Sequence, residues 1–162
     1  MNSPAVHIRP MSAADLNRVL EIAEGLHHAP RWTASAYRAA MNPDNTPRRI
    51  ALAASAPESH APVGFLVASL VPPEVELETI AVAVEAQRRG IGVLLLQALI
   101  KTLKTEPVDT LTLEVRASNQ TALNFYQQNG LQQIARRPRY YANPEEDAIL
   151  MRLNLINDRG HP

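Results

Sequence analysis

Gln87-Arg88-Arg89-Gly90-Ile91-Gly92-Val93 is the stretch around which the rest of the chain is organised. An alternating apolar segment, residues 75–84, precedes it, and a leucine-rich helical pattern, residues 94–104, follows it. This order predicts a strand, a glycine turn and the start of a helix. The first N–H groups of a helix lack intrahelical partners, and the helix dipole adds about half a positive charge there. We therefore expect a phosphate-binding site, with two glycines that leave the donors accessible.

The strand before this turn changes the phase of its apolar residues. They lie at positions 75 and 77, and then at positions 80, 82 and 84. Because side chains of a strand alternate with a period of two, the slip of one residue predicts a β-bulge near Glu78-Thr79. A strand that is buried on both faces near its end is the alternative, and it needs no bulge.

The remaining patterns give the element order β-α-α-β-β-β-α-β-α-β-β. Hairpin links predict antiparallel pairing in the first half, and strand–helix–strand units predict parallel pairing in the second. Near the end, residues 131–135 and 148–155 are expected to be strands, with a loop over residues 138–146 between them. The sequence thus predicts one α/β domain over residues 1–155, with a mixed sheet covered by helices on both faces. Residues 156–162 are expected to form a frayed tail.

Composition excludes several classes of protein. The 162 residues carry no formal net charge, which argues against broad nucleic-acid binding. There are no cysteines, and the histidines lack metal-ligand spacing, so no metal site is expected; they are His7, His27, His28, His60 and His161. The longest apolar run, near residues 93–100, is too short to span a membrane, and no signal sequence follows Met1. We expect a soluble cytoplasmic protein.

Two residues are candidates for proton transfer. Glu114 lies at the C-terminal end of a predicted strand, at the sheet edge where open α/β sheets bind ligands. A carboxylate there can take a proton from an amine, although it could equally be a solvated group or a partner of Arg116. Tyr126 follows on the next helix, where a tyrosine is more often part of the core.

Other polar and aromatic residues lie near the same edge. Asn119 starts the helix that carries Tyr126, where asparagine serves as a cap and can also contact a ligand. A basic and aromatic segment follows later, with Arg136, Arg137 and Arg139 before Tyr140-Tyr141. It could bind an acidic or polymeric partner, or it could be a solvated loop balanced by nearby acids.

These pieces together resemble the GCN5-related N-acetyltransferase (GNAT) superfamily over almost the whole chain. The segment Gln87 to Gly92 matches the Gln/Arg-x-x-Gly-x-Gly/Ala signature for acetyl-coenzyme A, and Ile80-Ala81-Val82 precedes it. Within the superfamily, the second half resembles the RimI group of ribosomal-protein N-terminal alanine acetyltransferases. The matching runs are residues 113–119 and 122–126, Arg136-Arg137, Tyr140-Tyr141 and Glu146-Asp147-Ala148, and the early Pro30-Arg31-Trp32-Thr33 resembles that group's Pro-Trp-Ser/Thr.

The resemblance implies a GNAT fold with six to seven strands and a splayed, bulged fourth strand. It also implies roles for residues of this chain. Backbone groups of Ile80, Ala81 and Val82 would bind the pantetheine arm and thioester of acetyl-CoA, and Arg88, Arg89, Gly90, Ile91, Gly92 and Val93 would cradle its pyrophosphate. Asn119 would contact the cofactor. Glu114 would act as general base and Tyr126 as general acid, with Trp32, Tyr140 and Tyr141 beside the acceptor.

The reaction that the resemblance implies is transfer of acetyl from acetyl-CoA to the N-terminal α-amine of a protein or peptide, with a ribosomal protein as the acceptor of the RimI group. An acetyltransferase for a small amine and a non-catalytic acyl-CoA-binding domain are the alternatives. Neither the acceptor nor the oligomeric state follows from the sequence. Among the departures from the group, Val93 stands where a basic residue is common, and Arg31 separates Pro30 from Trp32.

Overall fold

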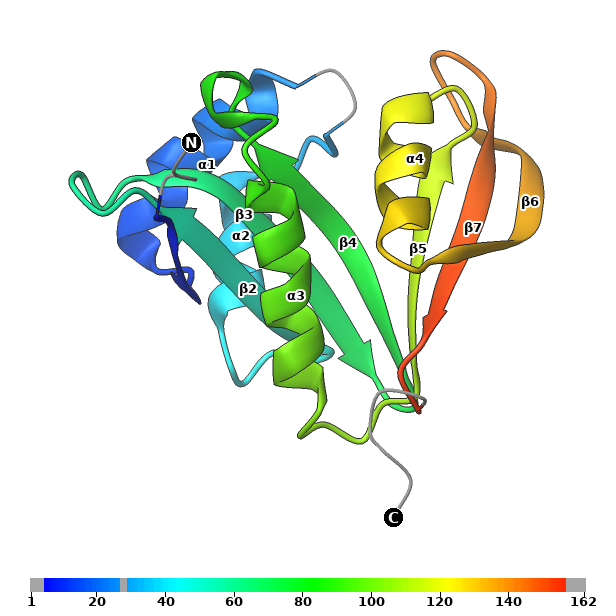
Figure 1. The fold of residues 1–162 in the computed structure, drawn as a ribbon, viewed down its shortest axis with the longest axis horizontal. Coiled ribbons are helices and arrows are strands. Elements are labelled where there is room, and N and C mark those ends of the chain that lie inside the picture. Colours follow the sequence, from blue (N-terminus) through cyan, green and yellow to red (C-terminus); the bar gives the residue numbers. More distant parts are fainter. Residues whose placement is uncertain (1–4, 27–28, 157–162) are drawn as a thin grey trace.

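A seven-stranded mixed sheet runs through residues 5–26 and 29–156, the part of the chain that the computed structural model describes (Figure 1). Its strands are β1 (His7–Pro10), β2 (Arg48–Ser55), β3 (Pro62–Val71), β4 (Glu74–Val82), β5 (Thr110–Arg116), β6 (Gln132–Tyr141) and β7 (Glu146–Asn154). In space they lie in the order β1-β2-β3-β4-β5-β7-β6. The predicted α/β class and mixed sheet are confirmed. The expected tail falls almost wholly outside the described residues.

Helices cover both faces of the sheet. They are α1 (Leu16–Glu24), α2 (Ala34–Met41), α3 (Ile91–Leu103) and α4 (Gln120–Gln128), with short 3₁₀ turns η1 (Ala13–Asp15) and η2 (Val84–Ala86). Neighbouring residues of β3 show the division. Phe65 meets Tyr37 of α2 with ring centroids 5.7 Å apart, whereas Gly64 faces Ile91 and Leu95 of α3. Because adjacent residues of a strand point to opposite faces, α2 and α3 pack on opposite sides.

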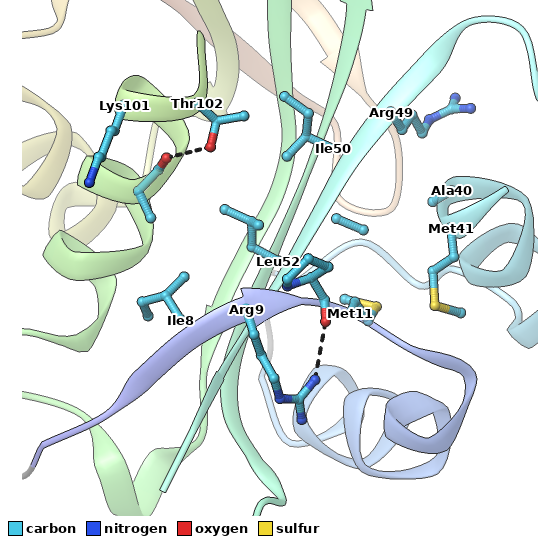
Figure 2. Close-up of a pocket in the computed structure, with 13 residues that line it drawn as sticks. Ile8, Arg9, Met11, Ala40, Met41, Arg49, Ile50, Leu52, Lys101 and Thr102 are labelled. Atoms are coloured by element: carbon cyan, nitrogen blue, oxygen red, sulfur yellow. Dashed lines mark hydrogen bonds between the residues drawn. The ribbon is translucent and has the colours of Figure 1, made fainter. Parts of the chain in front are cut away.

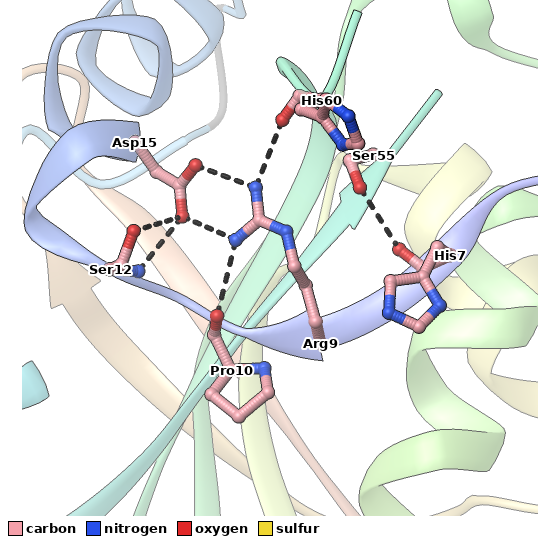
Figure 3. Close-up of polar contacts among 7 residues, drawn as sticks. All are labelled: His7, Arg9, Pro10, Ser12, Asp15, Ser55 and His60. Atoms are coloured by element: carbon pink, nitrogen blue, oxygen red, sulfur yellow. Dashed lines mark hydrogen bonds and ion pairs between the residues drawn. The ribbon is translucent and has the colours of Figure 1, made fainter. Parts of the chain in front are cut away.

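A buried ion pair joins the first strand to the first helix (Figure 3). The guanidinium of Arg9 donates two hydrogen bonds of 2.7 Å to the carboxylate of Asp15, whose residue is only 4% exposed. The backbone N–H of Ser12 donates to the same carboxylate at 2.8 Å. The guanidinium also donates to the carbonyls of Pro10 and His60, so one cation ties β1, η1 and the β2–β3 link together.

The predicted bulge is present in β4. In the antiparallel register with β3, Val67 pairs with Thr79 and Ala68 pairs with Leu77, which leaves Glu78 as the extra residue. Directly paired residues of neighbouring strands share a face. The bulge therefore changes the face to which odd-numbered residues of β4 point.

Beyond the bulge, the even-numbered residues of β4 lie on the α3 side. Ile80 pairs with Leu66 and Val82 with Gly64, and both apolar side chains are half-buried. The predicted continuation of this apolar set to residue 84 is wrong. Val84 lies in η2 and is 64% exposed, because the chain leaves the sheet after Val82.

The second half of the sheet differs from the prediction in two ways. Parallel pairing is confined to β4 with β5, because β7 inserts between β5 and β6 and pairs antiparallel with both. In addition, β6 extends to Tyr141, so Arg136–Tyr141 belongs to a strand and not to the predicted loop. Period-two patterning could not reveal this, because residues 132–140 are all exposed and β6 has no buried face to mark.

We predict that Asp15→Asn lowers the free energy of unfolding by about 2 kcal/mol at neutral pH, because the neutral amide removes the negative charge with which Arg9 pairs. The hydrogen bond to Arg9, the largest cause, lowers the pKa of Asp15. This contribution is therefore present above the unfolded-state pKa and is lost as pH falls through the lower, folded-state value. Urea unfolding at several pH values measures both effects.

Glu21→Gln is the matched control, since the Glu21 carboxylate pairs with Arg18 on the surface with a side chain 66% exposed. We expect a change within about 0.5 kcal/mol for that variant. Equal losses for the two variants would contradict the structural importance of Asp15.

Candidate active site

The glycine turn has the predicted strand–turn–helix setting, with η2 inserted between strand and turn. The side-chain amide of Gln87 donates to the carbonyl of Val82 at 3.0 Å and so ties the turn back to β4. Arg88 and Gly90 both have positive φ values, 63° and 78°. Gly90 is the N-cap of α3, so its neighbours present the first N–H groups of a 13-residue helix. The exposed side chains of Arg88 and Arg89 add positive charge to that end.

The two glycines of the turn, Gly90 and Gly92, are required for different reasons. Gly90 needs its freedom of conformation, since a Cβ atom there would meet nothing within 4 Å but would sit on a left-handed backbone. A Cβ atom on Gly92 would lie 3.3 Å from the Phe125 ring of α4. Gly92 therefore permits close packing of α3 on α4, which is a role that the sequence did not indicate.

β4 and β5 part well before the chain reaches this turn, which lies at the wide end of the opening. Their parallel pairing covers only Glu74–Glu76 with Thr110–Thr112. Figure 1 shows the two strands close together at one end and far apart at the other, with α3 and α4 on either side. In the described chain, no strand pairs with Ile80–Val82 on the β5 side, as the predicted splay requires. Backbone groups on that edge of β4 can bind a ligand.

Glu114 lies on β5 beside this opening. Its side chain is 17% exposed, and Oε1 lies 3.2 Å from Nη1 of Arg137. Glu114 shares a sheet face with Glu76, because Glu76 pairs with Thr112 two residues earlier. This is the face opposite α3, since the neighbouring Val75 pairs with Leu70 on the α3 side.

Three carboxylates gather on that face. Glu78, the bulge residue, pairs with Arg49 at 2.7 Å, and Glu114 pairs with Arg137. Desolvation, followed by the charges of Glu114 and Glu78, raises the pKa of Glu76. Within the described residues these acids do not form a group that could hold a metal ion.

Tyr126 approaches from α4. It is 9% exposed, and its ring meets that of Phe125 edge-on with centroids 5.3 Å apart. Burial, with a smaller influence of Tyr141, raises the pKa of Tyr126. The hydroxyl group therefore stays protonated at physiological pH, which is the state that a proton donor requires.

The two tyrosines of β6, Tyr140 and Tyr141, lie close enough to Glu114 to be influenced by its charge, and Tyr141 also influences Tyr126. A hydrogen bond to Glu114 is the largest cause that raises the pKa of Tyr140. The pKa of Tyr141 is raised by desolvation and then by the charge of Glu114, and Tyr141 in turn influences Tyr126. The guanidinium of Arg116 lies 4.3 Å from the Tyr141 ring centroid. The structure thus brings four of the predicted residues together.

Asn119 is the N-cap of α4. Its Oδ1 accepts a hydrogen bond from the N–H of Ala122 at 3.2 Å. Glu146 also supports this end of the helix, because its carboxylate accepts from the N–H of Ser118 at 2.5 Å. The sequence did not single out Glu146 for that role. A contact of Asn119 with the cofactor stays a prediction.

Trp32 occupies the other side of the proposed acceptor region. Its ring lies 5.3 Å from that of Tyr37, which itself contacts Phe65, so Trp32 is on the same sheet face as Glu114. Among the ring contacts of residues 5–26 and 29–156, Trp32 pairs with Tyr37 and not with Tyr140 or Tyr141. The structure therefore puts the predicted acceptor residues on one face without joining them.

A separate cavity of about 540 Å³ lies beside the N-terminal half of β2 and the C-terminal part of α3, away from the glycine turn (Figure 2). Residues of β1, β2, α2 and α3 line it, including Arg9, Met41, Arg49, Leu52 and Lys101. It contains neither Glu114 nor any residue of the glycine turn. We therefore do not assign it to the reaction.

Residues 16–131 match the acetyltransferase (GNAT) family, which is well over half of the chain. The chain belongs to this family. The GNAT match spans α1 to α4 and so includes the glycine turn, Glu114 and Tyr126. No helix among the described residues is long and apolar enough to cross a membrane.

Individual relatives agree with the family. The [ribosomal protein bS18]-alanine N-acetyltransferase of Salmonella typhimurium is 44% identical over 93 residues, which are 56% of this chain and 63% of that protein. The match thus spans less than two thirds of that relative. The crystal structure of the ribosomal-protein-S18-alanine N-acetyltransferase from Escherichia coli is 30% identical, with a TM-score of 0.79 over 93% of this chain and 94% of that one.

A more distant structure shares the fold. Arabidopsis thaliana NAA60 in complex with acetyl-CoA has a TM-score of 0.83 at 21% identity, over 94% of this chain and 99% of that one. The likeness confirms the arrangement of sheet and helices as a GNAT fold.

We predict that Gly90→Val weakens both the turn and cofactor binding. A β-branched residue at this positive φ should cost about 1–2 kcal/mol of folding free energy and misplace the first N–H groups of α3. Urea unfolding gives the first quantity, and calorimetric titration with acetyl-CoA gives the second. Gly90→Asn is the control, because asparagine tolerates the left-handed region. Valine and asparagine variants with the same affinity would argue against the turn as the pyrophosphate site.

Proposed function

We propose that this chain transfers an acetyl group from acetyl-CoA to the N-terminal α-amine of a protein or peptide. The observation that carries the proposal is the placement of Glu114 and Tyr126 beside the parting of β4 and β5. One group is a carboxylate and the other a buried, protonated hydroxyl, and Tyr141 lies near both. This is the pair that amine acylation by a thioester needs.

Each step of the reaction has a residue in this arrangement. The pyrophosphate of acetyl-CoA would bind at Arg88–Val93, and its thioester would lie along the open edge of Ile80–Val82. An α-ammonium has a pKa of about 7.7–8.0, so a carboxylate such as Glu114 can accept its proton directly or through water. The neutral amine attacks the thioester carbonyl, and an N–H of β4 stabilises the oxyanion. The C–S bond then breaks, Tyr126 protonates the departing CoA thiolate, and the acylated nitrogen gives up its extra proton, which can return to Tyr126, so that the products are the acetylated amine and free CoA.

The aromatic residues on the acceptor side favour a peptide over a small amine. The face of β5, β7 and β6 that carries Glu114 has an exposed aromatic residue, Tyr140, which is 50% exposed. Trp32 lies on the same face, across the parting of the strands. An extended chain can lie along such a surface with its N-terminus at Glu114. The names of the Salmonella and E. coli relatives support an N-terminal alanine, and a ribosomal protein is the acceptor that they suggest. Such an acceptor is made in the cytoplasm, where we accordingly place this chain.

Release of free thiol from acetyl-CoA, measured with a panel of peptides that differ in their first residue, tests this proposal. Matched N-acetylated peptides control for attack by lysine side chains, and polyamines and free amino acids test small acceptors. We expect turnover with at least one free N-terminus and none with its acetylated form. Turnover with small amines alone would replace the peptide proposal, and acetyl-CoA binding without turnover on any amine would indicate a non-catalytic domain.

We predict that Glu114→Gln lowers kcat about 10²–10⁴-fold, because the amide cannot accept the ammonium proton. Acetyl-CoA affinity should stay within about twofold, since Glu114 belongs to the acceptor side. Steady-state kinetics with the best peptide and calorimetry with acetyl-CoA measure the two effects. Glu145→Gln, on an exposed side chain paired with Arg139, is the matched control. A Glu114 variant with wild-type kcat would eliminate this residue as the base.

We predict that Tyr126→Phe lowers kcat about 10²-fold and makes the rate more sensitive to alkaline pH. In the wild type, the raised pKa of Tyr126 keeps the hydroxyl protonated well above neutral pH, so its donor function persists there. In the variant the proton must come from solvent. Rate profiles between pH 6 and pH 9.5 test this, and identical profiles for the two proteins would remove Tyr126 as the acid.

A further inference from the structure

Arg137 forms an ion pair with Glu114, the carboxylate that meets the ammonium group of the acceptor in the proposed reaction. Its Nη1 atom lies 3.2 Å from Oε1 of Glu114, and its guanidinium carbon lies 5.7 Å from the ring centroid of Tyr140. The Arg137 side chain is 55% exposed, whereas that of Glu114 is 17% exposed. A solvent-exposed cation thus covers a largely buried anion.

Strand register explains how Arg137 reaches Glu114. Arg137 pairs with Ala148, and Ala148 pairs with Arg116, so all three share the face of Glu114. The residue between the two arginines is a small alanine, which leaves room for the longer side chain to cross β7. Glu114 lies two residues before Arg116 on β5, within reach of a side chain of this length.

An irregularity in β6 brings the aromatic partner to the same place. The register shifts between Arg137 and Tyr141, which pairs with Glu146. Three residues of β6 therefore face one residue of β7, and Arg139 takes a positive φ of 56° within this bulge. Tyr140 thereby comes close to Glu114, whose carboxylate raises the pKa of the Tyr140 hydroxyl.

The other charged residues on this face leave an excess of negative charge around the Glu114–Arg137 pair. Glu76 and Glu78 approach from β4, and Arg49 from β2 neutralises Glu78. On the other side, Arg116 faces Tyr141 and pairs with Glu146 at 3.4 Å. Glu76 is thus an additional negative charge beside Glu114 and Arg137, which favours a cation at this point whether or not it belongs to the protein.

We propose that Arg137 is a positioning residue that takes the place of the acceptor's ammonium group at Glu114 and is displaced by it on binding. This inference rests on the proposed function, since it assigns Glu114 to the acceptor amine. Because the guanidinium end of the pair is solvent-exposed, the pair is worth only about 1 kcal/mol or less, so an incoming ammonium displaces the guanidinium at little cost. An uncharged acceptor cannot replace Arg137, and the pair therefore selects for cationic amines.

Binding of a minimal acceptor to the CoA-loaded protein tests this without need of turnover. The probe is Ala-Gly-Gly amide, and N-acetyl-Ala-Gly-Gly amide is its uncharged counterpart. We expect Arg137→Met to lower the Kd of the free-amine peptide about two- to fivefold, because no ion pair must first be broken. Arg137→Lys keeps the charge and should stay within about twofold of wild type.

Arg139→Met is the matched control on the same strand. Its guanidinium pairs with Glu145 at 3.1 Å, and its side chain is 83% exposed. We expect no change in Kd for that variant and no binding of the acetylated peptide to any of the proteins. An unchanged or higher Kd for Arg137→Met, or no detectable binding by any variant, would overturn the role of Arg137.

Kinetics provide the second readout. Displacement of Arg137 is part of acceptor binding, so Arg137→Met should lower KM for the free-amine peptide about two- to fivefold with kcat within about twofold of wild type, whereas Arg137→Lys should leave both values within about twofold. An unchanged KM together with an unchanged Kd would reject this inference while peptide acetylation stands. Conversely, a lower Kd in a protein that acetylates no peptide would reject the proposed function and leave the displacement of Arg137 intact.

Discussion

Pairing between β4 and β5 stops after three residue pairs, and the arrangement of the site depends on that interruption. The extra residue at Glu78 bends β4 and turns it away from β5. From that point the edge of β4 no longer serves a neighbouring strand, and its backbone groups become available to a ligand. The glycine turn that follows β4 puts the N-terminus of α3 at the wide end of the same opening. A sheet with continuous pairing would have closed this region.

The two faces of the sheet divide the work beside this opening. On one face, α3 and α4 pack closely where Gly92 meets Phe125, and α4 supplies the buried hydroxyl of Tyr126. On the other face, charged side chains gather around Glu114 with no helix over β5, β7 and β6 in the described chain. A low-dielectric side thus keeps a tyrosine protonated, while on the other side the solvent-exposed guanidinium of Arg137 pairs with the carboxylate of Glu114.

Much of this could be predicted from the sequence, because the signals are local. The phase slip in residues 75–82 indicated the bulge, and the glycines indicated the start of α3. Glu114 and Tyr126 were found with the help of the family resemblance, since neither a strand glutamate nor a helix tyrosine is distinctive alone. The end of the chain was harder. Residues 136–141 have the composition of a loop, yet pairing with β7 makes them a strand.

The sequence by itself determined the bulged strand, the glycine turn and the helix after it, because each depends on residues that are neighbours in the chain. It also specified the membership of the GNAT family, whose signature lies within that same segment. Only the tertiary structure decided that Arg137 covers Glu114, that Gly92 accommodates Phe125, and that Tyr141 lies near both catalytic candidates. These contacts join residues 15 to 33 positions apart. They depend on strand order and register, which no local pattern encodes. β7 follows both β5 and β6 in the chain, yet it lies between them in the sheet.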